Sequence, residues 1–263
     1  MTNDGTVGKA LDVLDHVARY GRPVRFGVLL AQSTFPKATL YRLLQTLTNQ
    51  NMLDYDSETQ TYRLGMRLVR LAHGAWMQSS LAPIARPYLD QLSAQVGHTV
   101  HLAQLDNAQV LYVDKRNAAQ PIEMFSDAGK VGPAYCTGVG KAMLAFLSPK
   151  EQKRAIKQQS FHRFTEHTYV SEETLCAELQ AIEARGYAFD REEHEPGIIC
   201  IAQPILSSMG KVLGALSITG STLGISLEQL EMLVPRLTET ATAIAADAQD
   251  WRFPDTNLQN TGT

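Results

Sequence analysis

The chain has 263 residues, of which 44% are apolar and 19% are charged, enough for one or two globular domains with real cores. No apolar run reaches the length of a membrane helix, and the N-terminus lacks a signal-peptide core, so we expect a cytoplasmic protein without a membrane partner. Three widely spaced cysteines, Cys136, Cys176 and Cys200, match no zinc motif and suit a reducing compartment better than a disulfide framework.

The formal net charge is −3, which by itself argues mildly against a nucleic-acid partner. The charge is unevenly distributed, however. Residues 1–80 hold nine Lys or Arg against six Asp or Glu, whereas the remainder holds fifteen against twenty-one. A slightly basic head on an acidic body has the right sign for a DNA-binding head, although the signal is weak.

The first 65 residues predict three helices followed by a hairpin. A helix over 7–20 ends at the sequence Gly-Arg-Pro, a short apolar helix follows over 26–33, and a third helix covers 36–50 with Pro36 in its first turn. Alternating apolar residues on both sides of a polar turn at 56–60 predict the hairpin. This order is typical of a winged helix-turn-helix, with the hairpin as the wing.

The third helix has one apolar face, formed by Leu40, Leu43, Leu44 and Leu47. Its other face carries Ala38, Arg42, Gln45 and Asn49, flanked by Tyr41 and Thr46, and no acidic residue lies between Ser33 and Asn51. A solvated surface helix more often carries pairs of opposite charge. We therefore expect contacts with DNA phosphates and base edges from Lys37, Thr39, Tyr41, Arg42 and Gln45, and a phosphate contact from Arg63 in the wing.

The rest of the chain predicts an α+β domain with a mostly antiparallel sheet. A linker helix over 66–79 and a helix over 81–96 come first. Strands are then expected at 98–105, 109–116 and 121–127, and later at 187–190, 198–206 and 211–219. Helices are expected at 139–147, 149–158, 171–185 and from Ser226 to about 249, before a disordered tail.

Glycines crowd the start of the helix at 139–147, where free backbone N–H groups favour an anion. A tight turn that needs glycine for close packing is an equally good interpretation, and both stay open. A nucleotide P-loop is excluded, because Tyr135 stands where glycine is required and Ala142 follows Lys141.

The charge run at 190–195 is interpreted as a solvated loop, except for Asp190, which ends a strand and could point inward. Cys200 is either a buried small apolar residue or part of a pocket lining. Ser217 and Thr219 share one strand face and indicate either a polar cavity or a satisfied pair of core hydroxyls. His98 and His101 fall on opposite faces of their strand, so no shared metal is expected, and no nucleophilic triad is evident.

Six stretches together resemble the IclR family of bacterial transcriptional regulators, from about Val7 to Ala245. They are "KALDVLDHVARYG", "FPKATLYRLLQTL", "YRLGMRLVRLA", "CTGVGKAMLAFL", "RGYAFDREEHEPGIICIAQPI" and "VLGALSITG". The resemblance implies a winged helix-turn-helix (1–65), a linker helix (66–80), an effector-binding domain related to GAF domains (81–250) and a tail (251–263). It also implies a homodimer or dimer of dimers, double-stranded operator DNA that is pseudo-palindromic, a small-molecule effector such as an organic acid, and no cofactor.

Carried over by motif, the resemblance implies an effector pocket formed by Met124, Gly132, Tyr135, Gly138, Val139, Asp190, Cys200, Ser217 and Thr219. Thr219 keeps the hydroxyl of the serine often found there, whereas Tyr135 and Val139 are bulkier than usual, so the identity of the ligand does not carry over. A carboxylate would lie against the N–H groups of Gly138 and Val139. No Lys or Arg is assigned to the pocket, so a neutral ligand stays compatible with it.

Two other functions are weighed against a ligand-responsive repressor. The first is an enzyme that uses Asp190, Glu193 and His194 for acid–base chemistry, although the sequence offers no nucleophile or metal set. The second is a sensor or scaffold whose helix-turn-helix binds protein. Salt-dependent affinity for DNA distinguishes the repressor from this second alternative.

Overall fold

A computed structural model describes residues 5–249, and the predicted disordered tail at 251–263 lies outside them. The chain divides after Gln78 into two compact units, each described here by itself. No helix within residues 5–249 is both long and apolar enough to cross a membrane.

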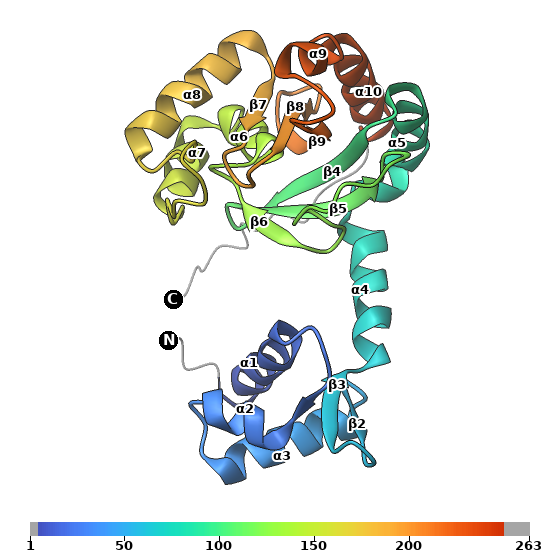
Figure 1. Ribbon diagram of the computed structural model, residues 1–263, viewed down its shortest axis with the longest axis vertical. Helices are drawn as coiled ribbons and strands as arrows, with labels where there is room; N and C mark the ends of the chain where they lie inside the picture. The colour runs from blue at the N-terminus through green and yellow to red at the C-terminus, as the bar shows by residue number, and fades with distance from the viewer. Residues whose placement is uncertain (1–4, 250–263) are drawn as a thin grey trace. The chain divides into compact units, whose positions relative to one another are not determined.

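The first unit is a winged helix-turn-helix, as predicted (Figure 1). Its elements are α1 (Gly5–Arg19), β1 (Val24–Arg25), α2 (Phe26–Gln32), α3 (Lys37–Asn49), β2 (Leu53–Asp56), β3 (Thr61–Leu64) and α4 (Met66–Ser79). The three strands form an antiparallel sheet in the order β1-β3-β2. The strand β1 was not predicted, because a two-residue strand has no periodicity to detect.

The leucine face of α3 forms the centre of this unit. Leu40, Leu43, Leu44 and Leu47 are buried together with Val13, Leu14 and Val17 of α1 and with Leu53 and Tyr62 of the hairpin. At the hairpin turn, the Asp56 carboxylate accepts hydrogen bonds from the N–H groups of Glu58 and Thr59. The amphipathic pattern therefore fixes which face of α3 points outward.

The second unit is built on a six-stranded antiparallel sheet in the order β6-β5-β4-β9-β8-β7. Its strands are β4 (Thr99–Asp106), β5 (Gln109–Arg116), β6 (Val131–Pro133), β7 (Ala188–Arg191), β8 (Ile198–Leu206) and β9 (Val212–Ser221). Its helices are α5 (Ala82–Val96), α6 (Gly138–Ala145), α7 (Pro149–Lys157), α8 (Glu172–Arg185), α9 (Leu227–Glu231) and α10 (Val234–Asp247). The predicted α+β class with an antiparallel sheet is confirmed.

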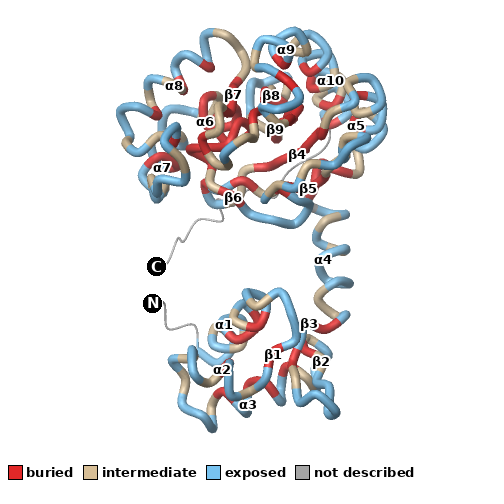
Figure 2. The backbone as a smooth tube through the Cα atoms, in the orientation of Figure 1, coloured by how far each residue is buried: buried red, intermediate tan, exposed pale blue. Residues whose placement is uncertain are grey.

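Helices cover the two faces of this sheet. The face of β8 that carries Cys200 and Ala202 lies against α6, since a Cβ added to Gly138 would meet both side chains. On the alternate face, Gln203 accepts a hydrogen bond from Thr238 of α10, which packs beside α5. In Figure 2 the buried segments of this unit concentrate in the central strands and in α6.

Two predicted elements differ in the structure. Residues 121–127 form no strand, because no neighbouring strand pairs with them, and the next strand is β6. The single helix expected from Ser226 to about 249 is divided into α9 and α10 by Met232 and Leu233, just before Pro235, which has no N–H to donate.

Candidate functional site

The outer face of α3 is exposed, and its cations have no ion-pair partner among the residues that the structure describes. Lys37, Tyr41, Arg42 and Gln45 are exposed, and Thr39 is half-buried. Within residues 5–249, neither Lys37 nor Arg42 makes an ion pair. The amide of Gln45 donates to the Tyr41 hydroxyl at 3.1 Å. This face therefore offers positive charge and amide groups to a partner.

Arg63 of the wing, unlike Lys37 and Arg42, forms an ion pair within the described residues. Its guanidinium lies 3.5 Å from the Asp54 carboxylate, its partner across the hairpin. Tyr55 and Tyr62 are the next cross-strand pair and lie on the opposite hairpin face. The Arg63 side chain is 67% exposed, so solvent screens this pair and the arginine stays accessible to a phosphate.

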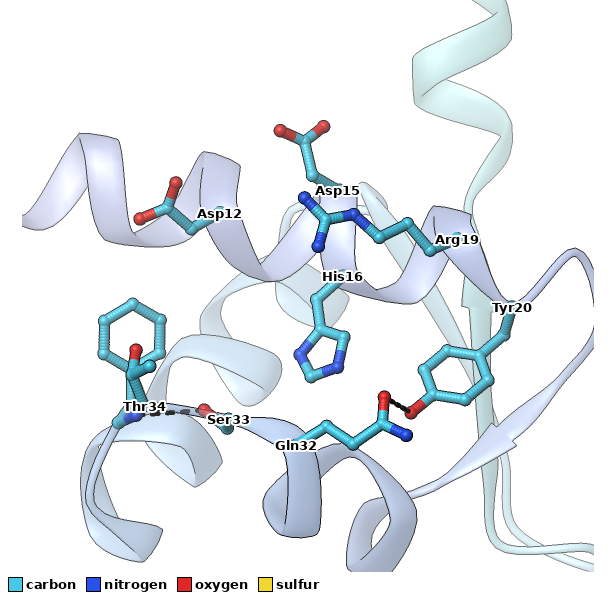
Figure 3. Close-up of a pocket in the computed structure, with 9 residues that line it drawn as sticks. Asp12, Asp15, His16, Arg19, Tyr20, Gln32, Ser33 and Thr34 are labelled. Carbon is cyan, nitrogen blue, oxygen red and sulfur yellow. Dashed lines mark hydrogen bonds between the residues drawn. The ribbon is translucent and has the colours of Figure 1, made fainter. Parts of the chain in front are cut away.

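A second surface feature of the first unit is a polar pocket between α1 and the turn that precedes α3 (Figure 3). Asp12, Asp15, His16 and Arg19 of α1 line one side, and Tyr20 donates to Gln32 at 2.7 Å. The carboxylates of Asp12 and Asp15 outnumber the Arg19 guanidinium, so the pocket offers no excess positive charge to a DNA phosphate.

The second unit contains a small cavity between the sheet and the start of α6, with a volume of about 30 Å³ and an opening to solvent. Six predicted residues line it together: Gly138, Val139, Asp190, Cys200, Ser217 and Thr219. Residues that were not predicted to form the effector pocket also line it: His101, Tyr112, Ser126, Thr137, His194, Glu195 and Ile198. Strand pairing explains one of these additions, since His101 lies opposite Ser217.

Met124, Gly132 and Tyr135 lie outside this lining. Met124 belongs to the segment that was expected to be a strand, and Gly132 lies in β6. The Tyr135 side chain is buried and donates its hydroxyl to the carbonyl of His162 at 2.6 Å. The part that these three residues play in binding stays a prediction.

A cluster of hydroxyls surrounds one imidazole at the cavity. His101 Nε2 lies 3.0 Å from the Ser126 hydroxyl, and His101 Nδ1 lies 3.3 Å from the hydroxyls of Ser217 and Thr219. Burial, together with the Lys115 ammonium, lowers the pKa of His101 to about 3. The ring is therefore neutral near pH 7, and the cluster can donate and accept hydrogen bonds without net charge.

Behind the cavity, Lys141 of α6 forms an ion pair with Glu193. Both side chains are almost fully buried, at 0% and 2% exposure. The interpretation of the charge run as a solvated loop is therefore wrong for Glu193. Glu193 can be buried because the Lys141 ammonium is buried beside it, and a buried carboxylate needs a buried partner of opposite charge.

Asp190 is the acidic residue that lines the cavity beside this pair. Its carboxylate accepts a hydrogen bond from the Glu193 N–H at 2.8 Å. Burial, and then the neighbouring Glu193 carboxylate, raise the pKa of Asp190 well above its usual range. Burial also raises the pKa of the Cys200 thiol, so this cysteine is not a reactive thiolate.

The segment between β5 and β6 is held against the mouth of the cavity. The Phe125 N–H donates to both oxygens of Glu195, at 3.0 and 2.9 Å. The His194 ring contacts Phe125 and Phe164 edge-on, with centroids 5.3 and 4.8 Å apart. Although burial opposes it, hydrogen bonds from His194 and Phe125 lower the pKa of Glu195 and keep it ionised.

The arrangement suits binding rather than catalysis. Within residues 5–249 the lining holds no lysine or arginine, and its cysteine, Cys200, and two histidines, His101 and His194, have no nucleophile–base geometry among the contacts above. Residues 5–249 contain no cluster of three His, Cys, Asp or Glu side chains that could hold a metal ion. Hydroxyls, a neutral imidazole and the start of a helix can instead orient a small polar ligand.

Comparisons with known proteins cover both units. Residues 6–57 match the family described as "IclR helix-turn-helix domain", and residues 73–246 match "Bacterial transcriptional regulator IclR C-terminal". The chain is 32% identical to the HTH-type transcriptional regulator BhcR of Paracoccus denitrificans (strain Pd 1222), over 90% of this chain and 85% of that protein. It is 31% identical to the regulator KdgR of Escherichia coli (strain K12), over 95% of each. The crystal structure of the Thermotoga maritima IclR is similar with a TM-score of 0.75 and 28% identity, over 93% of this chain and 98% of that chain.

Proposed function

Since this chain belongs to the IclR family of bacterial transcriptional regulators, we propose that it represses transcription from a pseudo-palindromic operator and that a small organic acid controls its affinity. Like its relatives, it is a DNA-binding transcriptional regulator and not an enzyme. We therefore reject the alternative function, in which Asp190, Glu193 and His194 carry out acid–base catalysis. A regulator of this kind acts on DNA in the cytoplasm.

The proposal for DNA depends on one observation, the exposed face of α3 with cations that have no partner among the described residues. We expect α3 to enter the major groove, with Lys37, Thr39, Tyr41, Arg42 and Gln45 contacting phosphates and bases. Arg63 would reach a phosphate from the wing, giving up an exposed ion pair that costs little to break.

We expect two or four copies of the chain to bind together, because a pseudo-palindrome is read by a symmetric protein. The first unit supports this expectation with exposed apolar side chains on two helices. These are Val7 and Leu11 on α1, and Met66, Val69, Leu71 and Met77 on α4. Apolar side chains that repeat along a helix and face solvent in the monomer favour an interface.

The cavity of the second unit is the proposed effector site. A carboxylate would accept from the N–H groups at the start of α6, near Gly138 and Val139, with the hydroxyls of Ser217 and Thr219 opposite. Because no Lys or Arg of the described part of the chain lines the cavity, dipoles and hydroxyls would hold the anion instead of a full charge. Occupancy would then favour one arrangement of the DNA-binding heads over another.

Replacing Arg42 by Ala tests the DNA interface. We expect the variant to bind its operator about tenfold more weakly or worse, since a bidentate arginine contact is worth about 1–3 kcal/mol. Gel retardation at two salt concentrations measures the change, and Lys150→Ala, on the exposed side of α7, is a control with the same change in charge. Equal operator affinity of the wild type and Arg42→Ala would show that the assigned face is wrong. An affinity that does not change with salt would favour the protein-binding scaffold.

A further inference from the structure

Two buried carboxylates and one ammonium meet beside the cavity of the second unit. Asp190 is 8% exposed, Glu193 is 1% exposed, and Lys141 is fully buried. The Lys141 ammonium lies 2.5 Å from Oε1 of Glu193, whereas Asp190 makes no ion pair within residues 5–249. If both carboxylates were ionised, one negative charge would be buried without a partner of opposite sign. This charge count favours a proton on one of the two carboxylates.

The Asp190 carboxyl lies where the effector carboxylate is expected. Asp190 lines the same cavity as Gly138 and Val139 at the start of α6, and a Cβ added to Gly138 would lie 3.6 Å from Cβ of Asp190. One carboxyl oxygen of Asp190, Oδ1, accepts a hydrogen bond from the Glu193 N–H at 2.8 Å, which leaves the other oxygen to carry a proton. An ionised Asp190 would repel an effector carboxylate at this place, whereas a protonated one can donate a hydrogen bond to it.

The titratable neighbours of Asp190 come from every element packed around it. They are Lys141 of α6, Cys200 of β8, His101 of β4, Tyr112 of β5, and Cys136, Glu193, His194 and Glu195 of the adjoining loops. The nearby cations Lys115, Lys130 and Arg191 lie outside the cavity lining. Burial raises the pKa values of both thiols and of the phenol and lowers that of His101, so these four groups are neutral near pH 7.

The lysine and the carboxylates around Asp190 carry more negative than positive charge. Lys141 is positive, whereas Glu193 and the hydrogen-bonded Glu195 are negative. Burial, and then the Glu193 carboxylate, raise the pKa of Asp190 to about 8. Glu193 has the ammonium as its partner, so the proton belongs on Asp190 near pH 7. Asp190 can therefore act as a hydrogen-bond donor in the cavity.

We propose that the effector carboxylate binds together with one proton, which the Asp190 carboxyl holds and donates in a hydrogen bond to the ligand. This inference rests on the effector site proposed above and adds a regulatory property to it, namely that effector binding weakens as the solution becomes alkaline. The N–H groups of Gly138 and Val139 would hold the second ligand oxygen. When Asp190 is ionised in the free chain, the proton comes from the solvent, and no covalent bond of the ligand changes.

The pKa of Asp190 sets the pH range in which the proton and the effector are coupled. A carboxylic acid ligand is itself ionised between about pH 6 and pH 9. Below about pH 7 Asp190 already holds its proton, so the affinity should be constant and no proton should be taken up. Above about pH 8 Asp190 is ionised in the free chain, so binding must take up a proton and the affinity should fall as pH rises. We expect an affinity about tenfold lower at pH 9 than at pH 7, with an uptake of about one proton at pH 9.

Isothermal titration calorimetry on the full chain tests the inference. The ligands are monocarboxylates from acetate to benzoate, and the neutral amide of each acid that binds serves as the uncharged comparison. Each titration is carried out at pH 6, 7, 8 and 9 in two buffers of different ionisation enthalpy, because the difference in heat gives the number of protons taken up. The amides should bind with similar affinity at pH 7 and pH 9, because an ionised Asp190 does not repel a neutral ligand.

Asp190→Asn is the decisive variant. Asparagine can still accept from the Glu193 N–H and donate to the cavity, but it cannot titrate. Its affinity for the acid should be near the wild-type value at pH 7 and unchanged at pH 9, without proton uptake. Asp106→Asn, at the end of β4 and outside the cavity lining, is the matched control and should keep the wild-type uptake. His194→Gln removes the neighbouring imidazole and should keep the uptake as well. Urea unfolding at pH 7 and pH 9 checks that each variant is folded.

Support requires proton uptake and weaker binding at pH 9 in the wild type and in Asp106→Asn, and neither effect in Asp190→Asn. If the wild type binds an acid with no proton uptake and equal affinity at pH 7 and pH 9, the inference fails and the effector site stands. If His194→Gln instead of Asp190→Asn abolishes the uptake, the imidazole holds the proton and the inference also fails. Loss of binding at pH 7 in a folded Asp190→Asn variant would show that the site needs an ionised carboxylate, which overturns the inference. A wild type that binds no acid of the panel would refute the effector site itself.

Discussion

Lys141 and Glu193 show how a buried charge pair supports the cavity without lining it. The ammonium of Lys141 is fully buried and pairs with the Glu193 carboxylate, and it also lies 4.8 Å above the ring of Tyr169. The N–H of Glu193 in turn donates to Asp190, which reaches the cavity. The pair therefore holds the position of Asp190 from behind. Removing one partner of such a pair costs far more than removing both, because a lone buried charge remains.

We predict that Lys141→Met lowers the free energy of unfolding of the second unit by about 3–5 kcal/mol. The double variant Lys141→Met with Glu193→Leu should recover most of this loss, because no unpaired charge is left. Urea denaturation at pH 7 measures both values. If the double variant is as unstable as the sum of its single variants, the two side chains do not act as a pair.

At this scale the sequence indicates side chains that share a strand but not those that meet across strands. Ser217 and Thr219 are recognisable because two residues of one strand face the same way. His101 is not recognisable as their neighbour from the sequence. Its place beside Ser217 depends on the pairing of β4 with β9, which are more than a hundred residues apart in the chain. The burial of Glu193 is not predictable from the sequence for the same reason. Only tertiary packing brings the Lys141 ammonium to its carboxylate.

At the scale of elements, close packing explains the glycines of α6. A Cβ on Gly138 would lie 2.4 Å from the Cys200 sulfur, and one on Gly140 would lie 2.4 Å from the carbonyl oxygen of Ala134. Both distances are too short for any real side chain. The close-packing interpretation of the Gly-rich segment is therefore supported, and it is compatible with N–H groups that face an anion, because the same glycines bring the helix start against the sheet.

We predict that Gly138→Ala destabilises the second unit by about 1–3 kcal/mol, because β8 or α6 must move to admit the methyl group. A comparable change in α4, Gly74→Ala, meets no atom within 4 Å and should stabilise its helix by about 0.5–1 kcal/mol. Thermal unfolding of the two variants gives the comparison. An unchanged melting temperature for Gly138→Ala would mean that α6 does not pack as closely as described.

Regular elements are predictable from periodicity, and the exceptions have physical causes. The leucine spacing of α3 and the short apolar runs of β8 and β9 are strong local signals. The segment at 121–127 has strand-like composition, yet the Lys115 ammonium bonds the Ser126 carbonyl and Glu195 holds Phe125, so no ladder forms. The break between α9 and α10 depends on Pro235. It was not predicted, because the capping box at Ser226 indicated the start of a single long helix.

At the scale of the whole molecule, each unit has a core of its own, and two separate sites follow. The first unit presents the exposed face of α3, and the second contains the cavity. We propose that they are the DNA-binding and effector-binding parts of one regulator, which agrees with the family that both units match. We propose a coupling free energy between the two sites, so that occupancy of the cavity changes the affinity for the operator.

The most direct test is the operator affinity of the full chain with and without the organic acid that gives the largest thermal shift in a metabolite screen. We predict that a saturating concentration changes the wild-type affinity at least about fivefold, the lower end of typical allosteric couplings. The variant Ser217→Ala, which loses a hydroxyl at the cavity, should need a higher concentration for the same change. An acid that binds in the cavity and leaves the operator affinity of the wild type unchanged would contradict the account.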